Sequence, residues 1–304
     1  MIQKIFEMTK FNKTKLGLLL VSFILVSAPV FGQRFAGGFK AGLNFSTLKG
    51  PSETDSSGSE VEENKTNTGF HIGAAFRMEL TEVFGLRAEL LYSQKGTTYN
   101  YDGNSWWVFY PSAGNPIYST GIRQEAISVT NTYIDIPLMA YARIGRIEVS
   151  GGVNASVLLG SRGTGDLTYR GQSLSGANIE SFDIALDYNY FSDKYGEANT
   201  LEEHKRTIGG NTVGIPKNIG AYYFGVDNGE KLYQRLDFGL NAGLSFYLSH
   251  TLFLGFRLNY GLTDITNGEQ DIARAQLAAD RSFILRTQDH DRNFSLQASI
   301  GFNL

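Results

Sequence analysis

The last stretch of the chain alternates strictly between apolar and polar side chains. Over residues 293–304 every even position is apolar, and every odd position is small or polar. The apolar positions are Phe294, Leu296, Ala298, Ile300, Phe302 and Leu304. Successive side chains of a β-strand point to opposite faces of a sheet, so this period of two predicts one long strand with an apolar face and a polar face.

The same alternation recurs in seven earlier segments. They span residues 39–45, 70–80, 84–92, 134–142, 147–159, 236–248 and 252–262. Their polar faces repeatedly carry charge, as at Asp237 and Arg257. A soluble sandwich would have shorter strands, with turn signals about every 8–12 residues. Transmembrane barrels use longer segments, apolar toward lipid and polar toward the lumen, so the pattern predicts an all-β, eight-stranded antiparallel up-and-down transmembrane β-barrel.

The connections between these segments alternate in length. The long ones are 51–67, which is acidic, 99–122, 161–231 and 266–290, and the short ones are 81–83, 145 and 249–251. Outer-membrane barrels have short periplasmic turns and long outer loops. We therefore expect a bacterial outer-membrane protein with both termini in the periplasm and four long extracellular loops.

Two places leave the strand pattern open. Within 161–231, alternation over 181–190 predicts a further strand, and 222–226 predicts another. If both crossed the membrane, the barrel would have ten strands. We favour an extracellular hairpin, because ten strands would turn 191–217 into a long periplasmic connection. In the fourth strand, Pro137 lacks a backbone donor and predicts a bulge or weak pairing.

The first 32 residues have the layout of a secretory signal peptide. Four lysines precede an apolar run at 16–26, and small residues follow it. The run is too short to cross a bilayer, so we expect cleavage before Gln33 and a barrel domain over 33–304. No later run of about 18 apolar residues exists, so an exported chain of this kind would enter a membrane only as a closed barrel.

Composition narrows the classes of partner and chemistry. The chain has no cysteine, which removes disulfides, thiolate metal sites, cysteine nucleophiles and the lipid-bearing cysteine of an exported lipoprotein. The formal net charge is −3, and basic residues cluster only near the start of the chain. No nucleic-acid partner is therefore expected.

Charged residues on the polar strand faces would line the barrel lumen. The basic ones are Lys40, Arg77, Arg87, Lys95, Arg143, Arg235 and Arg257, and the acidic ones are Glu79, Glu89, Asp135, Glu148 and Asp237. One interpretation makes them an ion-selective constriction or a proton relay. The other makes them a salt-bridge network that fills the lumen. We favour the network, because an eight-stranded barrel has just enough interior for side chains.

An unusual group of aromatic residues lies in the connection 99–122. Its members are Trp106, Trp107, Phe109 and Tyr110. One interpretation is a loop contact patch for a glycan or a protein, since exposed aromatic side chains supply contact area. The other, which we favour, is an interfacial aromatic girdle or the internal packing of a folded loop.

The sequence predicts no catalytic residue, metal site or cofactor. Its four histidines share no ligand spacing, and neither Gly-x-Ser-x-Gly nor His-Glu-x-x-His is present. His290 stands between Asp289 and Asp291 at the predicted outer rim, where barrel proteases place an Asp–His couple. A loop histidine flanked in this way is usually only solvated. We expect no enzymatic activity and keep a ten-stranded barrel hydrolase as an alternative.

Several segments resemble the PorT-like outer-membrane β-barrel family of Bacteroidota, a group of porin-family small barrels. They are GFKAGLNFS at 38–46, ELLYSQKG at 89–96, YIDIPL at 133–138, DFGLNAGL at 237–244, RLNYGLTDI at 257–265 and the terminal strand. The resemblance covers nearly all of the mature chain and implies an integral outer-membrane barrel. The segments carry no known chemistry, and the secretion role of the member that names the family does not extend to all its barrels.

These features together predict an outer-membrane protein with a structural or interaction role. The expected partners are outer-membrane lipid, an envelope protein or glycan at the outer loops, and the barrel-assembly machinery. That machinery would bind the C-terminal strand, whose alternating end carries Phe302 and Leu304. The alternative function is a small porin-like channel.

Overall fold

The computed structural model describes residues 34–304, without the side chains of 199–203. All regular secondary structure in these residues is β, in eleven strands of one sheet. No helix in this range is long and apolar enough to cross a membrane. The predicted signal peptide, 1–32, lies outside the described residues.

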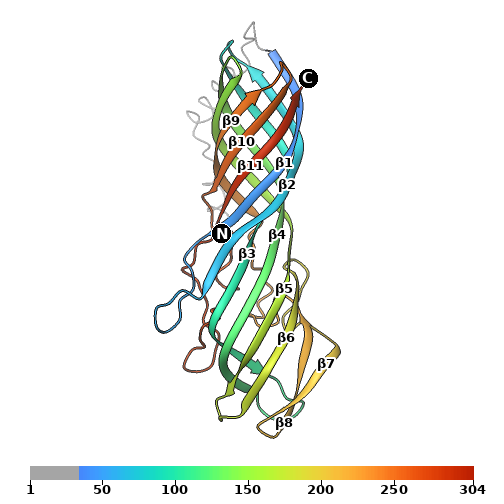
Figure 1. The fold of residues 1–304 in the computed structure, drawn as a ribbon, viewed down its shortest axis with the longest axis vertical. Helices are drawn as coiled ribbons and strands as arrows, with labels where there is room; N and C mark the ends of the chain where they lie inside the picture. The colour runs from blue at the N-terminus through green and yellow to red at the C-terminus, as the bar shows by residue number, and fades with distance from the viewer. Residues whose placement is uncertain (1–33) are drawn as a thin grey trace, which may run out of the picture.

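Eight of the strands close into a ring (Figure 1). In ring order they are β1 (Arg34–Lys49), β2 (Glu62–Glu79), β3 (Phe84–Phe109), β4 (Ile117–Ile144), β5 (Ile147–Ser173), β9 (Leu236–Tyr247), β10 (Leu252–Gly261) and β11 (Arg292–Asn303). Each neighbouring pair is antiparallel. The last strand pairs with the first, with Phe302 opposite Phe39, so the ring has no free edge.

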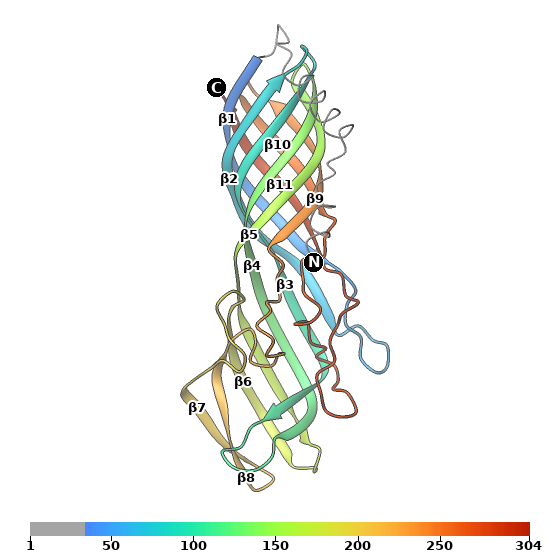
Figure 2. The ribbon, with the colours of Figure 1, turned by 180° about the vertical axis from the view of Figure 1, so that it is seen from behind.

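One end of the ring continues into an open, curved sheet, which we call the extension and define as residues 97–130 and 160–235. It forms the lower half of Figure 1 and is seen from behind in Figure 2. Here β3, β4 and β5 run on beyond the ring and are joined by β6 (Asn178–Asn189), β8 (Asn211–Ile219) and β7 (Ala198–Ile208). β6 pairs with β5, β8 runs parallel to β6, and β7 forms the outer edge.

The ring agrees with the predicted eight strands, and the ten-stranded alternative is wrong. β5 pairs directly with β9, from Ile147 opposite Phe246 to Val157 opposite Leu236. The segment between them, with β6, β7 and β8, therefore never enters the ring.

The predicted loop 99–122 is wrong, because most of it is strand. β3 runs to Phe109 and β4 begins at Ile117. The last four residues of β3, from Trp106, are all buried. The sequence of a strand that is covered on both faces is a continuous apolar run. It lacks the alternation with a period of two that is typical of a half-buried strand. The acidic loop 51–67 is also shorter than predicted, since β2 already begins at Glu62.

The segment 161–231 contains more strand than predicted, in different places. The strand predicted over 181–190 is present as β6, but residues 222–226 form turns rather than a strand. Tyr222 is held there by packing, since its hydroxyl donates to the backbone carbonyl of Tyr190 at 2.8 Å. β7 and β8 are rich in polar residues and show no simple alternation, so the sequence pattern did not reveal them.

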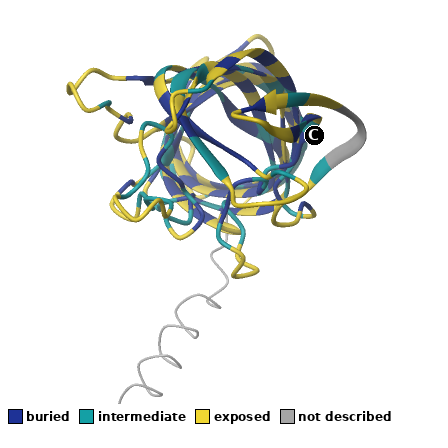
Figure 3. Ribbon diagram, turned by 90° about the horizontal axis from the view of Figure 1, so that it is seen from below, coloured by how far each residue is buried: buried dark blue, intermediate teal, exposed yellow. Residues whose placement is uncertain are grey.

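Along the ring strands, exposed residues alternate with buried ones (Figure 3). The exposed residues are mostly apolar and the buried ones mostly polar. On β10, Phe256 and Leu258 are exposed while Arg257 and Asn259 are buried. This arrangement is inverted relative to a water-soluble protein. It matches a barrel with lipid outside and a polar lumen.

The weak pairing predicted at Pro137 is confirmed on one side of β4. The ladder between β3 and β4 joins Ala88 to Leu138 and Leu91 to Asp135, with no pair at Pro137. On the other side Pro137 keeps its place opposite Asn154 of β5. Proline has no backbone N–H to donate, which accounts for the gap.

A charge on the outer face of the ring should be costly, because that face would contact lipid. We expect Leu258→Arg to lower the free energy of unfolding by about 2–4 kcal/mol, measured by urea titration in phospholipid vesicles. The matched control is Leu174→Arg, since Leu174 is also exposed but lies at the far end of the extension. The control should change stability by less than about 0.5 kcal/mol. Equal effects of the two substitutions would contradict a lipid-facing band.

Candidate functional site

Glu89 of β3 lies at the centre of the lumen between two cations. Its carboxylate is 2.6 Å from Nη2 of Arg257 and 3.3 Å from Nζ of Lys40, and all three side chains are buried. β3 and β10 are four places apart in the ring of eight in either direction, so they lie on opposite walls. The Glu89–Arg257 ion pair therefore spans the lumen.

A second cluster surrounds Glu148 of β5. Arg77 lies 3.0 Å from its carboxylate, Arg87 makes a further ion pair, and the hydroxyl of Tyr247 donates to it at 3.1 Å. Arg77 also donates to the hydroxyl of Tyr247, which stands on the opposite wall. The guanidinium of Arg77 stacks 4.3 Å above the ring of Tyr141, so this level of the lumen is filled as well.

Further polar contacts lie in the lumen, some between nearby strands and one between facing strands. Lys95 pairs with Asp135 at 2.9 Å. Asn293 of β11 donates to Asp237 at 2.8 Å and to the Tyr133 hydroxyl, on the facing strand β4, at 3.3 Å. The barrel interior is thus packed with paired polar side chains at successive heights.

His71 joins a buried hydrogen-bonded row inside the ring. Its Nδ1 lies 2.7 Å from Oδ1 of Asn44, and its Nε2 lies 2.9 Å from Oγ of Ser299. The three side chains link β2, β1 and β11. A Ser–His–Asn row can support nucleophilic catalysis, but here it fills lumen space between the Glu89 cluster and the wall.

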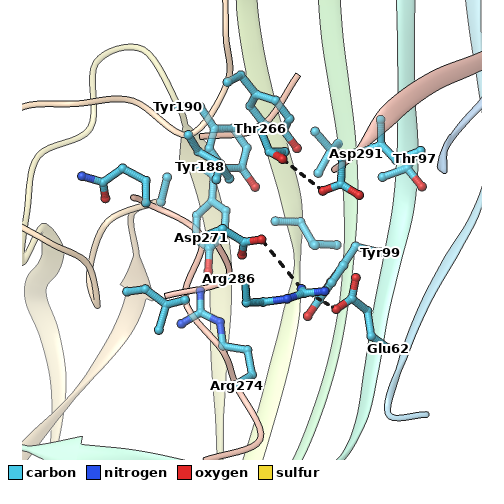
Figure 4. A pocket seen from close by; sticks show the side chains of 18 of the residues that line it. Glu62, Thr97, Tyr99, Tyr188, Tyr190, Thr266, Asp271, Arg274, Arg286 and Asp291 are labelled. Atoms are coloured by element: carbon cyan, nitrogen blue, oxygen red, sulfur yellow. Dashed lines mark hydrogen bonds and ion pairs between the residues drawn. The ribbon is translucent and has the colours of Figure 1, made fainter. Parts of the chain in front are cut away.

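A second site lies where the connection 262–291 packs against the extension. It is a partly enclosed cavity of about 110 Å³. Its aromatic wall comprises Tyr99, Tyr188, Tyr190, Tyr222, Phe224 and Tyr233, and its charged lining comprises Glu62, Glu125, Asp271, Asp291, Arg274 and Arg286. Strands supply Tyr99 and Tyr188 of the aromatic wall, and the segments that follow β6 and β8 supply its other four residues. The connection supplies Thr266, Asp271 and both arginines (Figure 4).

Arg286 organises one side of this cavity. Its guanidinium reaches Glu62 at 2.7 Å, Asp271 at 3.8 Å and also Asp289. Oxygen atoms of Asp271, Asp289 and Asp291 all lie within 4.8 Å of one another, a spacing that suits a metal ion. Arg286 already supplies a cation to two of these carboxylates.

Burial and crowding raise the pKa of the cavity carboxyls. Burial, reinforced by Asp271, raises the pKa of Glu62 to about 7 although Arg286 opposes it. Burial and then the neighbouring Asp289 raise the pKa of Asp291 to about 7. Burial likewise raises the pKa of Asp271 to about 6. The lining holds four acidic side chains and two arginines, so acidic groups outnumber basic ones in the cavity.

Sequence comparison places this ring in a known family. The profile of a family described as "Outer membrane protein beta-barrel domain" matches residues 27–267. The chain belongs to this family. The exposed apolar faces of the ring strands fit the lipid-facing surface that is typical of such barrels. No curated protein sequence matches the chain.

Solved structures include several barrels that this outer-membrane barrel resembles. Ail, the attachment invasion locus protein of Yersinia pestis, is 11% identical, over 88% of this chain and 98% of that one, with a TM-score of 0.34. OprG from Pseudomonas aeruginosa is 7% identical, over 90% and 97%, with a TM-score of 0.34. The outer membrane protease OmpT from Escherichia coli is 9% identical, over 88% and 95%, with a TM-score of 0.29. Likenesses of this size assign no ligand or activity to the chain.

Most of the charged residues predicted to line the lumen form ion pairs with one another, as expected of side chains on the inner face of the ring. Lys40, Arg77, Arg87, Glu89, Glu148 and Arg257 form the two clusters, and Lys95 pairs with Asp135. Asp237 is buried but accepts only from neutral donors, Thr263 and Asn293. The side chains of Glu79 and Arg143 are only partly buried, and Arg143 stacks 3.7 Å from the Tyr247 ring.

The assignment of Arg235 to the lumen is wrong. Arg235 is exposed and precedes β9, which begins at Leu236. Its guanidinium lies over the ring of Phe191, 5.3 Å from the centroid. The alternation of polar and apolar residues in the sequence continues one residue beyond the start of β9. It therefore assigned Arg235 to the lumen face, although this residue lies outside the strand.

The aromatic contact patch is also wrong for three of its four residues. Trp106, Trp107 and Phe109 are no more than 2% exposed, and only Tyr110 is half-exposed. Trp106 Nε1 donates to the Ala273 carbonyl at 3.0 Å. Trp107 packs against several rings of the extension, including Phe224 at 4.9 Å. The favoured alternative, internal packing, describes these residues, because strand β3 carries them into the core of the extension.

His290 does not pair with either flanking aspartate. Its Nδ1 lies 3.0 Å from Oδ2 of Asp264, and the side chain is largely exposed. Asp291 lines the cavity, while Asp289 pairs with Arg286. The His290 ring therefore contacts Asp264, whereas the two flanking carboxylates lie close to each other and to Asp271.

The sequence analysis missed the cavity as a site. A signal was present, because Tyr188 at the end of β6 is followed two residues later by Tyr190, and the connection 262–291 mixes acidic residues with arginines. Their convergence depends on how that connection folds back over β3 to β6. No local pattern specifies such a packing.

Removing Glu148 should destabilise the barrel. We expect Glu148→Gln to lower the free energy of unfolding by about 3–5 kcal/mol, because Arg77 and Arg87 would remain buried without a counter-charge. The control is Glu79→Gln, since Glu79 forms no ion pair with another described residue. Urea titration in phospholipid vesicles measures both. A cost below about 1 kcal/mol for Glu148→Gln would contradict a tightly paired lumen.

The extension should lose stability as pH rises. Glu62, Asp271 and Asp291 have folded pKa values above the ordinary value of about 4. Between about pH 4 and pH 7 the folded state therefore binds more protons than the unfolded state, and stability falls with increasing pH. Both tryptophans of the chain lie in the core of the extension, so their fluorescence reports this region.

We expect the melting temperature from tryptophan fluorescence to be several degrees lower at pH 8 than at pH 5. This corresponds to a loss of about 1–2 kcal/mol in the free energy of unfolding. Asp291→Asn removes one of the raised carboxyls and should flatten the dependence. Asp280→Asn, an exposed aspartate of the same connection, should leave it unchanged. A melting temperature that rises from pH 5 to pH 8 would contradict the charge excess.

Proposed function

We propose that this outer-membrane barrel has a closed lumen and works as an interaction protein through its extension. The observation that carries the proposal is the Glu89–Arg257 ion pair at 2.6 Å between opposite walls. A salt bridge across an eight-stranded ring leaves no continuous path for ions. The large ordered surface of the chain lies instead beyond the ring.

In this proposal the chain is an eight-stranded up-and-down barrel whose extension is extracellular. The connections at the opposite end are short, as at 145–146 between β4 and β5 and at 80–83 between β2 and β3. Short turns are typical of the periplasmic side of such barrels. Arg34, opposite Glu79 beside the turn 80–83, and Leu304, at the C mark of Figure 1, lie at that end, so both ends of the described chain would face the periplasm.

The resemblance to PorT-like barrels of Bacteroidota supports one part of the proposal, namely that the ring is a membrane barrel and the extension is a separate addition to it. The segments that carry it, such as 237–244 and 257–265, lie on or directly beside ring strands, and the extension falls outside the pattern. The extension would then be the part that differs between members and meets an envelope protein or an external ligand. The chain would reach the membrane through the assembly machinery, which would bind the apolar edge of β11 at Phe302 and Leu304.

We propose no enzymatic activity for this barrel. His290 is exposed and its ring pairs with Asp264. The hydroxyl beside this pair, on Thr266, donates to Asp264 at 3.1 Å rather than to the imidazole of His290. A hydrolase would need a nucleophile and an oxyanion donor within reach of one substrate atom.

Planar-bilayer recording tests the closed lumen. We expect the folded protein to give no stable single-channel current, and Arg257→Gln to lower stability without creating an ion selectivity. Insertion is checked independently by the boiling-dependent shift of the folded barrel on a gel. A reproducible single-channel current from the wild type, with a selectivity that Arg257→Gln alters, would establish a pore and overturn the proposal.

A further inference from the structure

The cavity of the extension contains a carboxylate without a cation. Of its acidic residues, Glu62 and Asp271 face Arg286, and Glu125 pairs with Arg123 at 2.6 Å. Asp291 forms no ion pair with any described residue and accepts a side-chain hydrogen bond only from Thr266, at 3.3 Å. A partly buried carboxylate in this position is poorly compensated.

The same cavity exposes further acceptors that have no donor. Gln270 is 7% exposed, and its Oε1 has no hydrogen-bond partner. Its Nε2 is already engaged by the Val226 carbonyl at 2.8 Å and by Asn228. A buried amide oxygen without a donor costs free energy, so a ligand that donates a hydrogen bond to Gln270 Oε1 would recover that cost.

Tyrosine rings enclose the space around these acceptors. Tyr190 packs edge-to-face against Tyr233 at 4.9 Å and against Tyr188 at 5.6 Å. All three are at least nine-tenths buried, and their hydroxyls make no hydrogen bond with another described residue. Aromatic faces attract cations and also accommodate short alkyl chains.

We propose that this cavity binds a compact organic cation bearing a primary ammonium group. The ammonium would lie against Asp291 and donate to Gln270 Oε1, and its carbon chain would pack against the rings of Tyr190 and Tyr233. This deepens the proposed function, on which it rests, by naming the chemical class of an external ligand. Excess carboxylate, an acceptor without a donor and aromatic walls are the three features that recognise an alkylammonium ion.

The size of the cavity limits the ligand. One water needs about 10–15 Å³ of such space, so about 110 Å³ admits a molecule of several non-hydrogen atoms. A glycan chain or a peptide segment would not fit inside. A bare divalent ion is disfavoured, because it would need several carboxylate ligands and Arg286 already pairs with two of the three, Asp271 and Asp289.

Calorimetric titration of the full chain in detergent micelles tests the proposal at pH 8 and constant ionic strength. The probes are n-butylammonium chloride, n-butanol and sodium butyrate, which share a four-carbon chain and differ in charge. We expect saturable 1:1 binding of n-butylammonium with a Kd of about 1 mM or tighter. The alcohol and the carboxylate should bind at least tenfold more weakly.

Two variants locate the binding. Asp291→Asn keeps the shape of the side chain and removes its charge, so it should weaken n-butylammonium binding at least tenfold. Asp280→Asn removes a charge from the same connection outside the cavity and should leave the affinity within twofold. The gel shift confirms that each variant is folded, and the comparison of the three probes on the wild type does not depend on either variant.

Absence of saturable n-butylammonium binding, equal binding of n-butanol, or an unchanged affinity in Asp291→Asn would each overturn the inference. Calcium chloride serves as a further probe, and calcium binding that Asp291→Asn abolishes while n-butylammonium does not bind would replace it with a metal site. These outcomes are separate from the conductance test. A barrel that conducts would refute the closed lumen and leave the titration result standing.

Discussion

Glu89 and Arg257 meet across the lumen, and this pairing of buried charges is the constraint on which the ring depends. A charge inside a narrow barrel has little water around it, so its desolvation must be offset by a partner with good geometry. An eight-stranded ring is just wide enough for side chains from opposite walls to reach each other. The strand register that places β3 opposite β10 and β2 opposite β9 therefore determines which charges can meet.

The same strands have a different environment once they leave the ring. Within it, one face meets lipid and the other meets the polar lumen. Beyond it, β3 is covered on both faces, and Trp106 and Trp107 become the centre of an aromatic core. The connection 262–291 closes this core from one side and brings arginines and carboxylates to its margin. The cavity lies at that margin, where an aromatic wall and uncompensated acidic groups occur together.

Much of the ring could be predicted from the sequence, because a strand between lipid and lumen must alternate with a period of two. For the same reason, the sequence could predict that charged residues such as Arg77 and Glu148 face the lumen. Their partners could not be predicted, since the pairing of β2 with β5 across the interior depends on the closed ring. The extension was largely missed, because the buried end of β3 does not alternate and the polar strands β7 and β8 do not either. The cavity depends on the packing of the connection 262–291 against strands far away in sequence, which no local pattern contains.

A double-mutant cycle between Glu89 and Arg257 tests the cross-lumen pairing most directly. The free energies of unfolding of the wild type, Glu89→Gln, Arg257→Gln and the double variant would be measured by urea titration in phospholipid vesicles. If the two side chains meet across the lumen, the cost of the double variant is smaller than the sum of the single costs by about 2 kcal/mol or more. Costs that add to within about 0.5 kcal/mol would mean that the two residues do not interact, and would contradict a lumen closed by this pair.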